Sequence, residues 1–125
     1  MSNTNEEVDD VRAVYEYDLP EEVQALGDKY VKKTIGLQKL RMREELAALD
    51  KAGQSAAKAG YFMVLAALVE VDGRRLDKAN GEDERILNRC DPAIRALIVE
   101  AQADVGSVPK GASDAFLKTR RVKVG

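Results

Sequence analysis

Five carboxylates that lie close together in the sequence are the first residues to test for chemistry, because carboxylate clusters bind calcium. They fall within thirteen residues and are Asp72, Asp77, Glu82, Asp83 and Glu84. A helix–loop–helix calcium site needs oxygen ligands at loop positions 1, 3, 5 and 12, with glycine at position 6. A loop starting at Asp72 has Arg74 at its third position, and a loop starting at Asp77 has Ala79 there. The spacing argues against this calcium site and favours a hairpin followed by a solvated helix start.

The chain has no histidine and a single cysteine, which removes most common catalytic and metal-binding side chains. Without histidine there is no imidazole base and no imidazole metal ligand, and one thiol cannot complete a zinc site or an intramolecular disulfide. A helix dipole could lower the pKa of Cys90, but packing beside Ile86 and Leu87 is the favoured interpretation. No glycine-rich phosphate loop occurs. The sequence therefore argues against an enzyme and predicts no cofactor and no metal.

Basic side chains form two further candidate contact sites. Arg74 and Arg75 follow the Asp72-Gly73 turn and could bind a partner's carboxylates, although exposed turn residues are the commoner explanation. The C-terminal basic residues are Lys118, Arg120, Arg121 and Lys123. Four charges without aromatic stacking would hold phosphate weakly, so nucleic acid is not the favoured partner. The alternatives are a charged edge strand that resists aggregation, or an ion-pair partner for the acidic N-terminal part of this chain.

Two large apolar residues, Phe116 and Leu117, follow Pro109 in a short predicted helix. A C-terminal segment that carries such residues could dock onto a partner. The alternative is that both side chains cover the core of the domain itself. The candidate partner-binding residues are therefore Asp72, Gly73, Arg74, Arg75, Phe116, Leu117, Arg120 and Arg121.

Length and charge place the chain among soluble single-domain proteins. Its 125 residues are 45% hydrophobic and 34% charged, with a net charge of −2. Residues 1–22 carry a net charge of −7, so the remainder carries +5. The acidic N-terminus is unlike a secretory signal, and the longest apolar run (61–69) is shorter than the ~20 residues of a membrane helix. We expect a disordered acidic tail over residues 1–10 and one domain over residues 11–125.

Period-2 alternation predicts strands in the N-terminal part of the chain. Residues 11–19 alternate apolar and polar side chains before Pro20, and residues 29–37 alternate less regularly. Residues 20–27 predict at most one helical turn that stops at Gly27. The dipeptide Asp72-Gly73 between short apolar segments predicts a hairpin.

Period-3.6 spacing predicts three main helices, over about 38–52, 55–69 and 92–105. Met42, Leu46 and Leu49 give the first helix an apolar face. The second helix is apolar on all sides from Tyr61 onward, so we expect it to be buried with the rest of the fold wrapped around it. Asp91-Pro92 is a helix-start signal for the third helix. Its apolar face is formed by Ile94, Leu97, Ile98, Ala101 and Val105.

Shorter elements complete the prediction. Residues 78–81 predict a turn, residues 82–90 and 112–118 predict short helices, and residues 120–124 predict a terminal strand. The resulting fold class is α+β and mainly helical. Its small sheet is expected to combine the N-terminal strands, the Asp72-Gly73 hairpin and the C-terminal strand.

The order of these motifs resembles the small tail-assembly proteins of tailed bacteriophages, including tail assembly chaperones and baseplate-associated proteins. The resemblance covers residues 11–125 and rests on the sequence VEVDG (69–73), an acidic helix start, CDPAIRALIVEA (90–101), a proline, a helix bearing Phe-Leu and the ending VKVG. Gln102 stands where an aromatic residue is expected in such a helix, which leaves an aromatic anchor at that position in doubt.

The resemblance implies a non-enzymatic protein that binds the tape-measure protein or another tail component in the host cytoplasm during virion assembly. A structural baseplate or tail component that stays in the virion is the alternative, and a small nucleic-acid-binding regulator is a third hypothesis. The resemblance supplies no catalytic residues. Its contact surfaces map only loosely onto the Asp72-Gly73 hairpin and the C-terminal segment.

Overall fold

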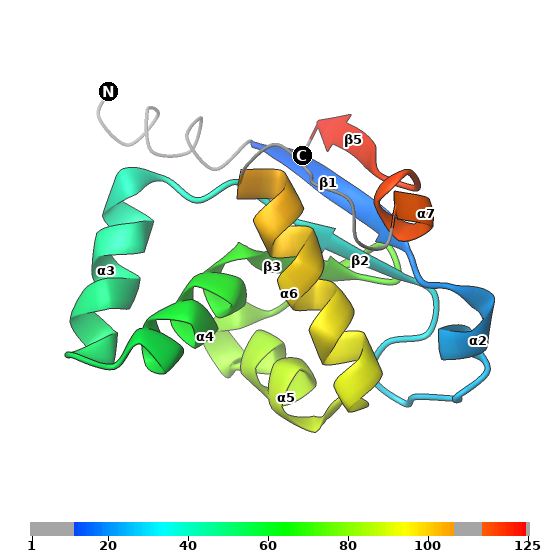
Figure 1. The fold of residues 1–125 in the computed structure, drawn as a ribbon, viewed down its shortest axis with the longest axis horizontal. Coiled ribbons are helices and arrows are strands. Elements are labelled where there is room, and N and C mark those ends of the chain that lie inside the picture. The colour runs from blue at the N-terminus through cyan, green and yellow to red at the C-terminus, as the bar shows by residue number, and fades with distance from the viewer. Residues whose placement is uncertain (1–11, 107–113, 125) are drawn as a thin grey trace.

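The computed structural model describes residues 12–106 and 114–124, which form an α+β fold built on one antiparallel sheet (Figure 1). The strands are β1 (Ala13–Asp18), β2 (Thr34–Leu37), β3 (Leu68–Val71), β4 (Arg74–Arg75) and β5 (Arg121–Val124). Their order across the sheet is β4-β3-β2-β1-β5. The first and last parts of the chain therefore meet, because β5 pairs with β1 at one edge. The predicted acidic tail over residues 1–10 lies outside the described residues.

Helices connect the strands of this sheet, and some of them cover one of its faces. They are α2 (Glu21–Gln24), α3 (Met42–Ala52), α4 (Ala56–Ala67), α5 (Glu82–Arg89), α6 (Pro92–Gly106) and α7 (Asp114–Leu117). Figure 1 shows α4, α5 and α6 in front of the sheet, whereas α3 stands at the periphery. Helix α3 packs mainly on α4, with which it forms an antiparallel helical hairpin closed by a short turn at Gly53.

Helix α6 forms as its sequence predicts. The Asp91 carboxylate accepts a hydrogen bond from the Ala93 N–H at 2.8 Å, and Pro92 opens the helix. Ile94, Ile98 and Ala101 are fully buried, so the predicted apolar face lies in the core. There it belongs to the same cluster as Tyr17, Ile35, Leu37 and Leu68 of the sheet. Burial of such side chains is the main contribution to folding.

The prediction for α3 was wrong in two respects. The helix begins at Met42 rather than near residue 38, because the Gln38 N–H donates to the Ala67 carbonyl at 2.9 Å and keeps the chain extended beyond β2. Its large apolar face is also not in the core. Ala48 and Ala52 are its buried residues, since these small side chains allow α3 to approach α4.

The helix predicted over residues 55–69 is present, but it is shorter than predicted and is not the central buried helix of the fold. Helix α4 ends at Ala67, and the apolar run continues as strand β3. Only Val64 and Ala67 are buried within the helix. Lys78 stabilises this end of α4, because its ammonium donates to the carbonyls of Leu65 (2.8 Å) and Ala66 (3.2 Å). The long apolar run is thus divided between a helix and a strand, and it does not form one buried helix.

The predicted strand over residues 29–37 is shorter in the structure. Only Thr34–Leu37 pairs in the sheet. The residues before it are held by carboxylates instead: Asp28 accepts hydrogen bonds from the N–H groups of Tyr30 (2.7 Å) and Val31 (3.0 Å). These side-chain contacts replace the ladder hydrogen bonds that a longer strand would make.

Two turns set the lengths of the remaining strands. Between β3 and β4, Asp72 has φ 54° and Gly73 has φ 78°, and a left-handed pair of this kind suits a two-residue hairpin turn. At the C-terminal end, Thr119 closes the turn after α7 by donating its hydroxyl to the Phe116 carbonyl at 2.7 Å. The chain then enters β5, which pairs antiparallel with β1 as the terminal-strand prediction anticipates.

Candidate functional site

The most unusual surface of the described chain is the apolar face of α3. Met42, Leu46 and Leu49 are 71%, 56% and 46% exposed. They lie at i, i+4 and i+7, so they share one side of the helix. Single exposed apolar residues are normal, but three large ones on one helix face form a patch of the kind that marks interaction sites.

The N-terminal end of α3 is fixed to the sheet by an ion pair. Arg12 donates to both carboxylate oxygens of Glu44, at 2.8 and 3.0 Å. The same carboxylate accepts a hydrogen bond from the Arg41 N–H at 2.7 Å, which caps the start of the helix. Hydrogen bonding from Arg12 outweighs the effect of burial and lowers the pKa of Glu44. The exposed face of α3 is therefore carried on a positioned helix.

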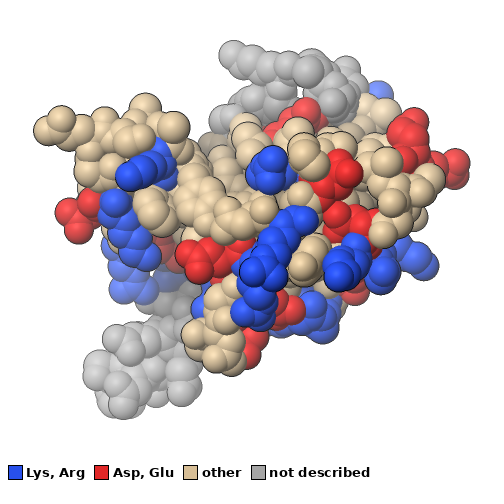
Figure 2. Space-filling view, turned by 90° about the horizontal axis from the view of Figure 1, so that it is seen from below, with Lys and Arg blue, Asp and Glu red and all other residues tan. Residues whose placement is uncertain are grey.

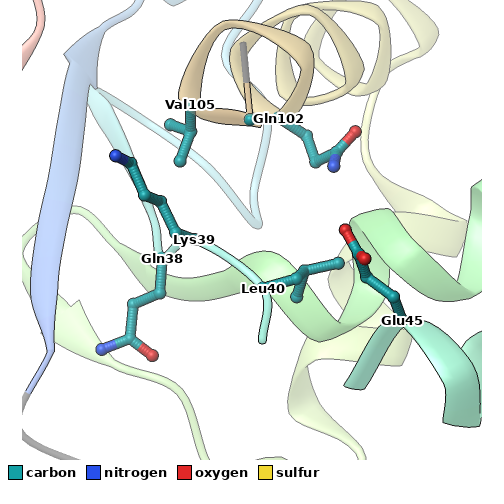
Figure 3. Close-up of a pocket in the computed structure, with 7 residues that line it drawn as sticks. Gln38, Lys39, Leu40, Glu45, Gln102 and Val105 are labelled. Carbon is teal, nitrogen blue, oxygen red and sulfur yellow. The ribbon is translucent and has the colours of Figure 1, made fainter. Parts of the chain in front are cut away.

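A hollow of about 390 Å³ separates the start of α3 from the end of α6 (Figure 3). Leu40 and Glu45 line it on one side, and Gln102, Val105 and Gly106 line it from α6. Glu45 connects the hollow to the α3 face, because Met42 and Leu49 are its i−3 and i+4 neighbours on the helix. The exposed apolar face and the hollow are parts of one surface.

Two polar side chains at this hollow are turned away from it. The Gln38 amide donates to the Arg12 carbonyl at 3.3 Å. The Lys39 ammonium lies over the Tyr15 ring, 5.7 Å from its centroid, and Figure 3 shows it directed away from Glu45. Among the described residues, no hydrogen bond or ion pair engages the Glu45 carboxylate. Glu45 is therefore the free charge at this end.

A second hollow, of about 350 Å³, lies between α4, α5 and α6. Its lining is mostly apolar and includes Ala57, Gly60 and Tyr61 of α4 and Val99 of α6. Of the described residues in this lining, Arg95 is the charged one. Gln102 lines both this hollow and the first one, so the two adjoin along α6. We call these two adjoining hollows the α6 groove.

A third hollow, of about 290 Å³, lies on the other side of the α3–α4 hairpin. It differs from the α6 groove because its charged groups are engaged. Lys78 pairs with Asp83 at 3.0 Å, and the Lys51 ammonium lies over the Phe62 ring, 5.9 Å from its centroid. A surface whose charged groups already have partners within the chain offers less to a charged partner.

The residues of the Asp72-Gly73 hairpin mainly support the fold. The Asp72 carboxylate accepts hydrogen bonds from the N–H groups of Lys32 (3.0 Å), Lys33 (2.6 Å) and Thr34 (3.1 Å). Arg74 forms an ion pair with Glu82 at 2.6 Å. Arg75 is exposed on β4. Of the four predicted contact residues here, Asp72 and Arg74 have structural partners.

The basic C-terminal residues pair with carboxylates of the same chain. Arg121 contacts Glu16 (2.8 Å) and Asp18 (2.7 Å), and Lys123 contacts Glu16 (3.1 Å) and Glu70 (2.8 Å). Burial raises the pKa of Glu16, but the hydrogen bonds from Arg121 and Lys123 outweigh it and leave this pKa lowered. For these residues the structure shows the alternative in which the basic C-terminal side chains form ion pairs with the acidic N-terminal part of the chain.

Phe116 and Leu117 belong to the core rather than to an exposed docking helix. Phe116 is 4% exposed and stacks on Tyr17 with the ring centroids 5.2 Å apart, and Leu117 packs beside them, partly buried. Tyr17 donates its hydroxyl to the buried Asp104 carboxylate, which Arg120 also contacts at 3.3 Å. Burial, followed by this hydrogen bond, raises the pKa of Tyr17.

The predicted contact residues do not form one site. Those of the β3–β4 turn lie at one edge of the sheet, and Arg120 and Arg121 lie at the β5 edge, with three strands between β4 and β5. Sequence reasoning missed the α6 groove. Its signal was present in the outward residues of α6, since Arg95, Val99, Gln102 and Gly106 recur at i, i+4, i+7 and i+11.

Residues 12–106 and 114–124 offer little support for a metal site or a reactive thiol. No cluster of three or more cysteine, aspartate or glutamate side chains there could hold a metal ion. Cys90 is buried against Ile86 and Leu87, and burial, with the nearby Asp28 charge, raises the pKa of its thiol. A raised pKa opposes thiolate formation. No described helix has both the length and the apolar character needed to traverse a bilayer.

Comparisons of the chain with protein-family models, curated proteins and solved structures find no match. The site must therefore be interpreted from its own geometry.

Proposed function

We propose that this protein is a non-enzymatic binding protein that engages another polypeptide through the exposed face of α3 and the adjoining α6 groove. The observation that carries the proposal is the exposure of Met42, Leu46 and Leu49 on a helix whose packing on α4 is already complete through Ala48 and Ala52. Leaving three large apolar side chains in water forgoes their burial energy, and a partner that covers them would recover it.

The charge distribution supports a protein partner over nucleic acid. Arg121 and Lys123 are occupied by Glu16, Asp18 and Glu70. The face that carries α5 shows basic and acidic side chains interspersed rather than a basic stripe (Figure 2). Tight phosphate binding needs several unpaired cations on one face. The regulator hypothesis is therefore the weaker one.

We further propose that the binding partner is a component of a bacteriophage tail, with the tape-measure protein as the first candidate, and that binding takes place in the host cytoplasm during assembly. The resemblance of the motif order to tail-assembly proteins supports this step. An exposed helix face beside an apolar groove suits a partner rich in amphipathic helices, because helices present apolar residues at matching spacing.

The test is co-purification with a bacteriophage tape-measure protein, the first candidate partner. Leu46→Glu should abolish retention, because it places a charge at the centre of the α3 face. Leu26→Glu is the matched control: Leu26 is 53% exposed against 56% for Leu46, and it lies outside the groove lining. Equal retention of both variants would overturn the proposal.

A second measurement decides between assembly factor and structural component. Mass spectrometry of purified virions should find this chain absent if it acts only during assembly. Recovery in stoichiometric amount would replace the chaperone proposal with that of a baseplate or tail component, and would leave the α3 surface as its contact site.

A further inference from the structure

The α6 groove has the length of a short helix. Its lining from α6 runs from Arg95 to Gly106, eleven residues apart, which corresponds to about 16 Å at the usual helical rise of ~1.5 Å per residue. An occupying helix would contact it over roughly three turns. An extended strand would leave backbone N–H and C=O groups unpaired along the second hollow, since that part of the groove is walled by helices rather than by a sheet edge.

The floor of the groove is open at its centre. Gly60 of α4 lines it, and a Cβ added at this glycine would have no heavy atom within 4 Å. Ala56 and Ala57 line it at the start of α4, and Tyr61 and Val64 line it beyond Gly60. Small residues on a helix face let a second helix approach closely. The space above Gly60 is therefore available to an apolar side chain of the occupant.

Unpaired charges of opposite sign mark the two ends of the groove. Arg95 has no ion pair among the described residues, and it stands in an otherwise uncharged lining. Glu45 is the free carboxylate at the other end, because the Lys39 ammonium lies over Tyr15. An occupant that complements both ends is acidic where it meets Arg95 and basic where it meets Glu45.

This charge arrangement also sets a direction. The C-terminal end of a helix carries partial negative charge and its N-terminal end carries partial positive charge. The occupant's C-terminal end therefore belongs beside Arg95, near the start of α6, and its N-terminal end beside Glu45, near the end of α6. Such a helix runs antiparallel to α6.

We infer that the α6 groove receives one amphipathic helix of the partner, antiparallel to α6, with an acidic C-terminal turn on Arg95 and an apolar side chain over Gly60. This inference rests on the proposed function and specifies the partner's chemistry at that same surface. The occupant is a different polypeptide, and a second copy of this chain is an alternative that the test distinguishes.

The first experiment fills the groove. With the tape-measure protein that the wild-type chain retains, Gly60→Leu should weaken binding at least about tenfold, because its side chain occupies the docking space. Gly60→Ala should bind as the wild type does. Thermal unfolding and circular dichroism of both variants establish that the fold is kept, and alanine at this helical position should raise the melting temperature.

The second experiment determines the direction in which the bound helix runs relative to α6. A photo-crosslinking amino acid replaces Val99 in one variant and Gly106 in another. The partner peptide linked from position 99 should lie about seven residues C-terminal to the peptide linked from position 106. Arg95→Glu should weaken binding about five- to tenfold, and Arg95→Lys should retain most of it.

The outcomes separate the two proposals. If Leu46→Glu abolishes binding but Gly60→Leu does not, the groove inference fails and the proposed function stands. A reversed order of linked peptides would overturn the antiparallel direction, and links between two copies of this chain would show that the groove is a self-association surface. If the wild-type chain retains no tape-measure protein, both proposals fall together.

Discussion

Helices α3 and α6 have the same spacing of apolar residues, but these residues are exposed in α3 and buried in α6. Met42, Leu46 and Leu49 of α3 and Ile94, Ile98 and Ala101 of α6 are both spaced at i, i+4 and i+7. The α6 residues are fully buried, whereas each α3 residue is at least 46% exposed. The spacing identifies a face of a helix, but it does not say whether this chain or another one covers that face.

The cause of the difference is the position of each helix relative to the sheet. Helix α6 crosses β2 and faces the layer that contains Ile35 and Leu37, so its apolar face has a complementary surface. Helix α3 lies outside the sheet and has α4 as its main neighbour. Its contact with α4 uses Ala48 and Ala52, so its larger apolar side chains remain exposed.

The largest expected effect comes from matched truncations in the two helices. Ile98→Ala should lower the free energy of unfolding by ~2–5 kcal/mol, because it opens a cavity in a closely packed core. Leu46→Ala should change it by less than ~0.5 kcal/mol, because the side chain is mostly in water already. Urea denaturation of the isolated chain measures both values. A comparable loss in the two variants would show that α3 is covered in solution.

Removing one hydroxyl tests how the C-terminal part of α6 is held. Tyr17→Phe should lower the free energy of unfolding by ~1–3 kcal/mol, because the buried Asp104 carboxylate loses a hydrogen-bond donor. Tyr15→Phe is the matched control, since the Tyr15 hydroxyl makes no hydrogen bond within the described residues. If the two variants unfold at the same urea concentration, the Tyr17–Asp104 contact contributes nothing to stability.

These comparisons show what could be predicted from the sequence. The strand over residues 11–19, the Asp91-Pro92 helix start and the terminal strand each depend on local signals, and the structure has an element at each place. The end of α4 at Ala67 depends instead on a distant side chain, because Lys78 binds the carbonyls of Leu65 and Ala66. A uniformly apolar run contains no local signal for that boundary.

The candidate site was harder to predict than the fold. The sequence named Phe116 and Leu117 as candidate docking residues and left open that they cover the core, and only the contact with Tyr17, almost a hundred residues away, decides for the core. It chose Asp72 for its place in a turn, and the Asp72 carboxylate is used by the N–H groups of Lys32, Lys33 and Thr34. Which polar groups remain free is a property of tertiary contacts.

A smaller effect is expected at the anchor of α3. Arg12→Met keeps much of the aliphatic stem and removes the ion pair with Glu44, so it should cost about 1 kcal/mol or less. Its clearer signature is faster hydrogen exchange of the α3 amides, with those of α6 unchanged. Arg43→Met, also on α3 but exposed, is the control. Equal exchange rates in Arg12→Met and the wild type would mean that α4 alone positions α3.

The last comparison is between the carboxylates at the starts of α3 and α6, whose substitution is expected to give the smallest effect on stability at neutral pH. Glu44 caps α3, and Asp28 accepts a hydrogen bond from the Asp91 N–H at 2.7 Å just before α6. For Asp28, burial raises the pKa, but hydrogen bonds from Val31, Asp91 and Tyr30 outweigh it, and its pKa, like that of Glu44, lies below the ordinary value.

A lowered folded-state pKa means that the unfolded chain takes up a proton first as the pH falls. Both contributions are therefore fully present above the ordinary values of 4.5 for Glu44 and 3.8 for Asp28, and they are lost as the pH falls through the lower folded-state values. Glu44→Gln and Asp28→Asn should each flatten the acid dependence of the unfolding free energy. Amide hydrogen exchange should separate the two effects. Protonation of Glu44 in acid should speed exchange of the α3 amides, and protonation of Asp28 should speed exchange in the first turn of α6. If the acid dependence of the unfolding free energy is unchanged in both variants, other groups titrate instead.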